Sequence, residues 1–144
     1  MKKTQKKLGN KGFSLVELIV VIAIMAVLVG VLAPTLIRNV EKSRESKDAQ
    51  NVDSIKEAVE VTLQNEKAYS EALNQSVITF DANNKAVIKD GLTNFTSEFN
   101  STMNISKTEL TSKKFKEANK TKTITFKVSD NGQVSVENAP ELDK

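Results

Sequence analysis

The pattern of hydrophobic and polar positions divides the chain into one long apolar run and a mixed remainder. From Phe13 to Ile37 the only charged residue is Glu17. The part from Phe13 to Ala33 holds 21 residues. As a helix it would be about 32 Å long, which is enough to cross the hydrocarbon core of a bilayer. This run therefore predicts a membrane-spanning helix.

A basic segment precedes the apolar run. Its five lysines, with no acid among them, are Lys2, Lys3, Lys6, Lys7 and Lys11. The positive-inside rule therefore predicts that residues 1–12 stay in the cytoplasm and that the chain after Pro34 lies outside.

Glu17 is the exception within the apolar run. A carboxylate near the end of a spanning helix costs about 2 to 3 kcal/mol on insertion scales, so an ionisable residue there is a functional hypothesis by default. If the chain is cut between Gly12 and Phe13, Phe13 carries a free amine four residues before Glu17. The amine and the carboxylate could then neutralise each other, within one chain or between two. The alternative is a tolerated interfacial glutamate in an ordinary membrane anchor.

The helix is predicted to continue past the apolar run, because residues 35–67 contain no Gly or Pro and are rich in helix-forming residues. One face is apolar, with steps of three and four residues: Val52, Ile55, Val59 and Leu63. The opposite face is predicted to be solvated, and its charged residues include Glu41, Asp48, Asp53, Glu57 and Glu60.

The region after Tyr69 alternates between strand and turn patterns. Strands are predicted at 77–80 and 85–88 around a turn at 81–84, and at 121–128 and 133–137 around the hairpin sequence Asp130-Asn131-Gly132. A short helix is predicted from the spacing of Leu92, Phe95, Phe99 and Met103, with Thr93 as the candidate N-cap. Residues 104–120 give no clear pattern, and the lysine-rich stretch at 113–122 is interpreted as a solvated loop.

This C-terminal head has few large apolar side chains, and its roughly 75 residues are marginal as an independent core. A small antiparallel sheet laid on the stripe from Val52 to Leu63 would bury both surfaces. The sequence therefore predicts an α+β fold in which a long helix packs under a sheet.

The segment Lys11-Gly12-Phe13-Ser14-Leu15-Val16-Glu17, followed by an uninterrupted apolar helix, resembles the N-terminus of the type IV pilin family, signal peptide included. The resemblance runs from Lys11 to Pro34 and does not extend to the head. It implies that a prepilin peptidase cuts after Gly12 and methylates the new N-terminal Phe13. Glu17 then corresponds to the glutamate that acts in assembly. Ser14 stands where threonine is commonest in the family.

The resemblance also implies a division of the chain and a set of partners. The expected segments are a leader at 1–12 that is removed, a membrane and filament-core helix at 13–37, an amphipathic helix at 38–68 and a sheet-bearing head at 69–144. The expected partners are copies of the same chain, the peptidase, and an assembly platform driven by a cytoplasmic ATPase. The subunit is expected in the cell membrane before assembly and in a surface pilus afterwards, serving motility, adhesion or DNA uptake.

Pro34 matches the family's proline at the end of the membrane segment. It has no backbone N–H to donate and crowds the preceding turn, while Gly30 lies one turn earlier. Together they predict a kink or an easily unwound segment between the two halves of the helix.

Other interpretations of the N-terminus remain. A pseudopilin of a type II secretion or competence system shares the same motif, and a singly anchored surface binding protein shares the span. A secretory signal peptide fits poorly, because the apolar run is longer than usual and contains Glu17. The only sequence similar to a signal-peptidase cleavage site is Val31-Leu32-Ala33, and Pro34 follows it directly, which is a poor position for that enzyme.

The composition of the chain limits the partners and the kinds of catalytic or metal site that can be expected. The formal net charge is +3 and falls to −2 once the five leader lysines are removed, so nucleic acid is not expected as a partner. The chain contains no His and no Cys, and neither an enzyme, a catalytic residue, a cofactor nor a metal site is predicted. The missing cysteines, which depart from many Gram-negative pilins, and the Lys- and Asn-rich composition suggest a Gram-positive source.

Two weaker signals lie in the head. Oxygen ligands gather near one turn, at Asp81, Asn83, Asn84 and Asp90, but without the EF-hand spacing, so turn chemistry is favoured over calcium. Five Asn-X-Ser/Thr triplets, at Asn74, Asn94, Asn100, Asn104 and Asn119, are explained by the abundance of these residues.

Overall fold

The computed structural model describes residue 12 and residues 14–141. The chain divides into two compact units, one ending at Arg38 and one beginning at Asn39. In chain order the elements are α1 (Leu15–Thr62), α2 (Glu66–Ala72), β1 (Gln75–Phe80), β2 (Ala86–Ile88), α3 (Thr93–Thr102), the 3-10 helix η1 (Ile105–Lys107), α4 (Lys113–Thr121), β3 (Thr125–Val128) and β4 (Val134–Glu137).

Helix α1 contains both the apolar run and the first part of the head. It passes through Gly30 and Pro34 with helical backbone at every position, so the structure shows no unwound segment there. It ends at Thr62, and Asn65 then accepts hydrogen bonds from the backbone N–H groups of Lys67 and Ala68 to start α2. An asparagine side chain in this position competes with continuation of the helix.

The four strands form one antiparallel sheet in the order β2-β1-β3-β4. Both predicted hairpins are present. In the first turn the Asp81 carboxylate accepts the backbone N–H groups of Asn83 at 2.8 Å and Lys85 at 2.9 Å. In the second, Gly132 adopts a positive φ of 77° beneath the ring of Tyr69.

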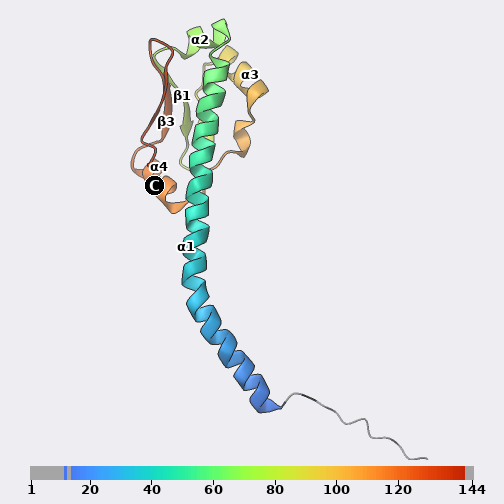
Figure 1. Ribbon diagram of the computed structural model, residues 1–144. Helices are drawn as coiled ribbons and strands as arrows, with labels where there is room; N and C mark the ends of the chain where they lie inside the picture. The colour runs from blue at the N-terminus through green and yellow to red at the C-terminus, as the bar shows by residue number, and fades with distance from the viewer. Residues whose placement is uncertain (1–11, 13, 142–144) are drawn as a thin grey trace, which may run out of the picture. The chain divides into compact units, whose positions relative to one another are not determined.

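The core of the head lies between α1 and the sheet, as Figure 1 shows for the second compact unit. Val52, Ile55 and Val59 of the predicted stripe are buried, and Leu63 packs at its margin. Phe80 and Phe126 of the sheet join the same core, with ring centroids 6.3 Å apart. The predicted fold is confirmed: a long N-terminal apolar helix packs against a small antiparallel four-stranded sheet in an α+β arrangement.

Helix α3 follows the predicted spacing, because Leu92, Phe95 and Phe99 are buried. Its N-cap is Leu92 rather than Thr93, and Leu92 supplies no side-chain cap. The prediction of Thr93 as the N-cap was wrong. The cap comes instead from α2, where the Glu71 carboxylate accepts the backbone N–H of Phe95 at 3.0 Å.

Helix α4 corrects the interpretation of the lysine-rich stretch as a solvated loop. Ser112 caps this helix by accepting the N–H of Phe115, and Phe115 and Asn119 face inward and are buried. The spacing of these two inward residues was missed because lysines surround them. The stretch is an amphipathic helix whose lysines cover the outer side.

Asp48 also departs from expectation, because it lies in the interface with the head rather than on a solvated face. It is fully buried, and its carboxylate accepts the backbone N–H of Thr111 at 2.9 Å and that of Ser112 at 2.7 Å. Glu41, two turns earlier, accepts the N–H of Lys113. These two acids fasten the start of α4 to α1, with negative charge at a helix N-terminus where it is stabilising.

Candidate processing and assembly site

The candidate site begins at Gly12, which lies outside the helix and is exposed. A Cβ atom built at Gly12 meets nothing within 4 Å. The fold of the chain therefore does not require glycine at this position, and any such requirement must come from a molecule that handles this segment. Phe13, the predicted new N-terminus, lies outside the described residues.

Ser14 and Glu17 form a reciprocal capping box at the start of α1. The Glu17 backbone N–H donates to the Ser14 hydroxyl oxygen at 3.2 Å, and the Ser14 backbone N–H donates to Glu17 Oε2 at 2.9 Å. Two N–H groups that the helix start would leave unpaired are thereby satisfied. The Glu17 carboxylate is thus held at the positive end of the helix dipole.

This cap holds the Glu17 carboxylate at the backbone N–H of Ser14. Ser14, whose N–H it accepts, is bonded directly to Phe13. A free amine created at Phe13 would arise one residue from that contact. The Ser-X-X-Glu spacing before an apolar run is the sequence signal from which this capping box could have been predicted.

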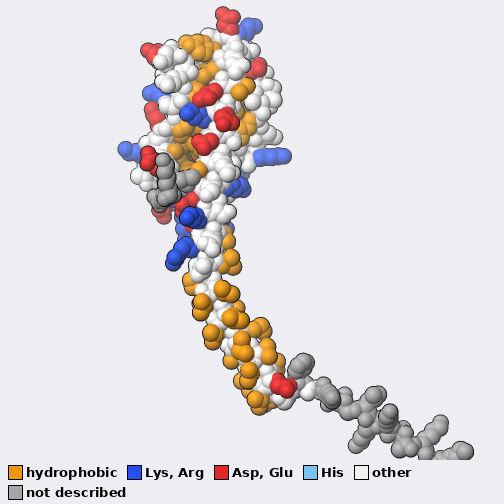
Figure 2. Space-filling model, viewed as in Figure 1, with side chains coloured by type: hydrophobic (Ala, Val, Ile, Leu, Met, Phe, Trp, Pro, Cys, Tyr) orange, Lys and Arg blue, Asp and Glu red, His pale blue; other side chains and the backbone are white. Residues whose placement is uncertain are grey.

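Behind the cap, α1 presents apolar side chains in every direction. Apart from Ala33, each residue from Ser14 to Val40 is exposed, and this part of the chain contains the one helix, among the described residues, long and apolar enough to cross a membrane. Figure 2 shows the apolar side chains covering this stretch, with an acidic group near its start. Pro34 lies within it and is exposed. A helix that is apolar all round needs a membrane or other helices around it.

A separate hollow lies in the head, next to the first turn. It has a volume of about 530 Å³, and its lining includes Phe80, Asp81, Lys116 and Asn119. Two of the residues considered for calcium have side-chain oxygens engaged by the chain itself: Asp81 Oδ1 closes its turn, and Asn84 Oδ1 accepts from the Asn119 side chain at 3.3 Å. The described residues contain no cluster of three or more acidic, His or Cys side chains suited to a metal.

The comparisons with known proteins bear on the N-terminus alone. The family model for the prokaryotic N-terminal methylation motif matches residues 7–33, which include the Gly12-Phe13 junction, the capping box and most of the exposed apolar stretch. No curated protein and no solved structure matches the chain. The chain therefore carries, at residues 7–33, the class III signal peptide of type IV pilins, on an α+β fold arranged like theirs.

Proposed function

We propose that the chain is the precursor of a type IV pilus subunit. The methylation motif supports a pilin-like or pseudopilin precursor, and the motif and fold are those of a structural protein. The observation that carries the proposal is the exposed apolar part of α1, which continues as one helix into the core of the head. A membrane can cover that surface before assembly, and copies of the same helix can cover it in a filament.

In this proposal the subunit waits in the cell membrane with its N-terminus in the cytoplasm. A prepilin peptidase cuts between Gly12 and Phe13 and methylates the Phe13 amine. An assembly platform, driven by a cytoplasmic ATPase, then moves the subunit into a surface filament that serves motility, adhesion or DNA uptake. Leader, filament-core helix, amphipathic helix and head correspond to residues 1–12, 13–37, 38–68 and 69–144.

Glu17 has a defined role in this scheme. An unpaired carboxylate in an apolar filament core costs several kcal/mol even after relaxation, and an unpaired amine on Phe13 carries a similar cost. Pairing the amine of an incoming copy with Glu17 of a copy already in the filament removes both costs. The pair also fixes the axial position, because a slip of one turn would leave both charges unpaired. Pro34 is proposed to let α1 adjust locally on entering the filament.

A pseudopilin of a type II secretion or competence system is the second candidate, because the methylation motif is common to both classes. Long surface fibres that contain this chain favour the pilus subunit. Loss of protein secretion in a deletion strain, with fibres retained, favours the pseudopilin. A singly anchored binding protein would keep its leader.

Processing is tested at Gly12. Because the chain itself leaves open space at this position, Gly12→Val should leave the fold unchanged and obstruct only the peptidase. We expect the variant to keep its leader and to form no fibres, while the wild-type chain begins at methylated Phe13 by mass spectrometry. A normally shortened Gly12→Val chain would contradict the proposal.

A further inference from the structure

Helix α4 and the residue that follows it form a basic segment in the head. Residues 113–122 contain five lysines and one acid, whereas the rest of the chain from residue 13 onward contains eleven basic and seventeen acidic residues. The segment is therefore a local basic surface on an otherwise acidic protein. Its lysines are Lys113, Lys114, Lys116, Lys120 and Lys122, and its acid is Glu117.

The fold places this segment at the end of the head where α1 enters it. Phe115 and Asn119 face inward and are buried. The Asn119 side chain donates to the Asp81 backbone oxygen at 3.0 Å and accepts the Ile124 N–H at 3.0 Å. These contacts hold α4 against the turn after β1 and the residue before β3. Figure 1 shows α4 beside the part of α1 that comes first in the second compact unit.

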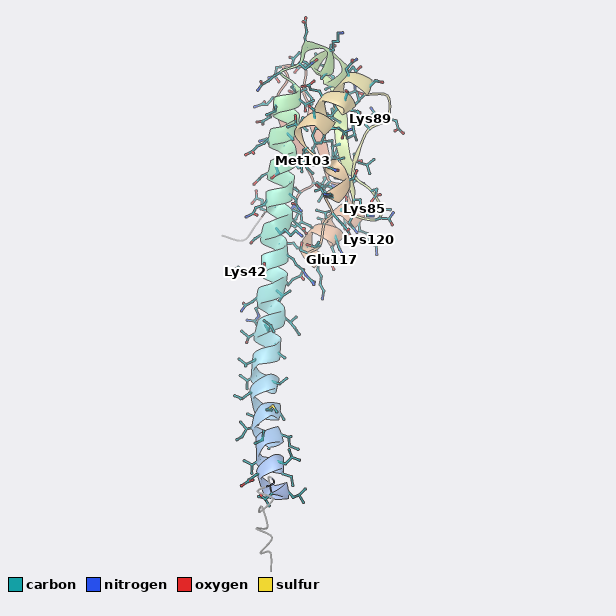
Figure 3. The ribbon with its side chains drawn as sticks, turned by 90° about the vertical axis from the view of Figure 1, so that its right-hand side faces the viewer. Lys42, Lys85, Lys89, Met103, Glu117 and Lys120 are labelled. Carbon is teal, nitrogen blue, oxygen red and sulfur yellow. The ribbon has the colours of Figure 1, made fainter. Side chains whose placement is uncertain are left out.

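The outer side of α4 carries charged residues that point away from the core. Lys113, Glu117 and Lys120 follow one another at steps of four and three residues, so they lie on one side of the helix, and all three are exposed. Figure 3 labels Glu117 and Lys120 at the lower end of the head. The ammonium groups of Lys113 and Lys120 form no ion pair with any residue that the structure describes.

Two backbone contacts fix the height of α4 along α1. Lys113 donates its N–H to the Glu41 carboxylate. Ser112 donates its N–H to the Asp48 carboxylate at 2.7 Å. Glu41 follows Ile37, the end of the apolar run, by four residues in the same helix, which is a rise of about 6 Å. A membrane surface at the end of that run would lie within about one Debye length of the start of α4, since this length is about 8 Å at physiological ionic strength.

We propose that, before assembly, the lysines on the outer side of α4 bind anionic phospholipid headgroups of the membrane that α1 spans. This inference rests on the membrane-anchored stage of the proposed function. Two observations select this partner: the basic surface follows directly on the span, and its charge is complementary to anionic headgroups. The long lysine side chains can lay their apolar stems along the head while their ammonium groups reach the lipid phosphates.

Such a contact holds the head against the membrane while the precursor waits. The attraction sums over several lysines, requires no fixed stereochemistry and weakens with salt. It is therefore reversible and is released when the subunit leaves the bilayer. A second copy of the chain, presenting its acidic surface to the lysines, is the competing occupant.

The contact is tested with the whole chain in lipid nanodiscs that hold one copy each. Because the chain contains no cysteine, Thr121→Cys, at an exposed position that ends α4, accepts a single fluorophore. Lipids with a nitroxide on the headgroup, at the same fraction in every disc, quench the fluorophore when the membrane surface is close. We expect about twofold stronger quenching in phosphatidylcholine discs that contain about 30% phosphatidylglycerol than in phosphatidylcholine alone. High salt should remove the difference.

Charge variants identify the residues responsible. Lys113→Glu with Lys120→Glu should remove the difference between the two lipid compositions, whereas Glu117→Lys should enlarge it. Lys67→Glu with Lys89→Glu is the matched control, because both lysines are exposed and Figure 3 labels Lys89 at the opposite end of the head from Lys120. This control should behave as wild type. Circular dichroism confirms that each variant keeps its fold.

A second label position checks that the quenching is local. The same fluorophore at Ser70→Cys, an exposed position in α2, should show no difference between the lipid compositions. A difference of equal size at this position would show that the head as a whole, and not the face of α4, approaches the membrane, and would overturn the assignment.

The remaining outcomes separate lipid from protein and this contact from the proposed function. Equal quenching at Thr121→Cys in both lipid compositions, or a difference that the charge reversal leaves unchanged, overturns the contact. Self-quenching between fluorophores in discs with two copies, without quenching by lipid, assigns the lysines to a second copy and also overturns it. None of these measurements requires fibres, so the contact can fail while the pilus function stands. Absence of fibres from the wild-type chain would overturn that function without changing the result in nanodiscs.

Discussion

At the scale of single residues, carboxylates hold the starts of several helices in this chain. Glu17 accepts a backbone N–H at the start of α1, Glu71 does so for α3, and Asp48 does so just before α4. The first contact spans three residues, and its spacing can be predicted from sequence. The other two join positions 24 and 64 residues apart. Neither can be predicted locally, because only the folded head brings the partners together.

Glu71 makes the stability of the head depend on pH. The backbone N–H of Phe95 lowers the pKa of the Glu71 carboxyl below its ordinary value, and the Asn94 side chain acts in the same direction. A lowered folded-state pKa means that this contribution is fully present above the ordinary glutamate pKa of about 4.3 and is lost as pH falls through the folded value. Glu71→Gln should therefore lower the Tm at pH 7 and flatten its decline in acid. Thermal unfolding of residues 38–144 between pH 7 and pH 2 measures both, and an unchanged acid profile would contradict this role.

Gly132 is the glycine that the fold requires most clearly. A Cβ atom there would lie 2.5 Å from the Tyr69 ring, and φ is 77°. Gly132→Ala should destabilise the head by about 1 to 3 kcal/mol. Gly91→Ala is the control, because its φ of 89° is equally strained but its Cβ meets nothing within 4 Å. Chemical denaturation should find Gly132→Ala the less stable of the two, and equal losses would show that the Tyr69 contact is unimportant.

At the scale of elements, the sequence predicts the helices and strands whose apolar residues recur with a regular period. It does not predict an element whose position is fixed by contacts with residues far away in the chain. The helical spacing of apolar residues is enough to predict the stripe of Val52, Ile55 and Val59. The strand patterns and turn residues are enough to predict the two hairpins. Helix α4 was missed because only Phe115 and Asn119 face inward among its lysines, and its start is fixed by Ser112 and the acids of α1. The processing site follows from its motif, whereas its cleavage and assembly roles stay predictions.

The stripe of α1 is the element on which the head depends. Removing residues 1–37 leaves the compact unit that begins at Asn39 and includes Val52, Ile55 and Val59. We expect a soluble, folded monomer with a cooperative thermal transition. Starting the chain at Tyr69 instead should expose the apolar face of the sheet and give an aggregated or molten product. If the shorter fragment melts as cooperatively as the longer one, α1 is not part of the required core.

At the scale of the whole molecule, Glu17 connects the fold of one chain with the assembly of many. Glu17→Ala removes the carboxylate half of the capping box together with the charge, so we expect a cleaved, membrane-inserted subunit with a normal head and few or no fibres. Glu17→Asp keeps the charge with a shorter reach and should assemble partially. Neither variant alone distinguishes a weakened helix start, worth about 1 kcal/mol, from a lost ion pair.

Glu17→Gln makes that distinction, because glutamine can replace glutamate in a capping box but cannot neutralise an amine. If pairing with the Phe13 amine drives assembly, Glu17→Gln should form few fibres despite an intact cap. Ser14→Ala is the matched control: it removes the hydroxyl that accepts the Glu17 N–H and leaves the carboxylate charged, so its fibres should be close to wild type. Fibres are counted by electron microscopy with subunit levels matched by immunoblot. Abundant fibres from Glu17→Gln together with loss of fibres from Ser14→Ala would show that the helix cap, and not the charge, is what assembly requires.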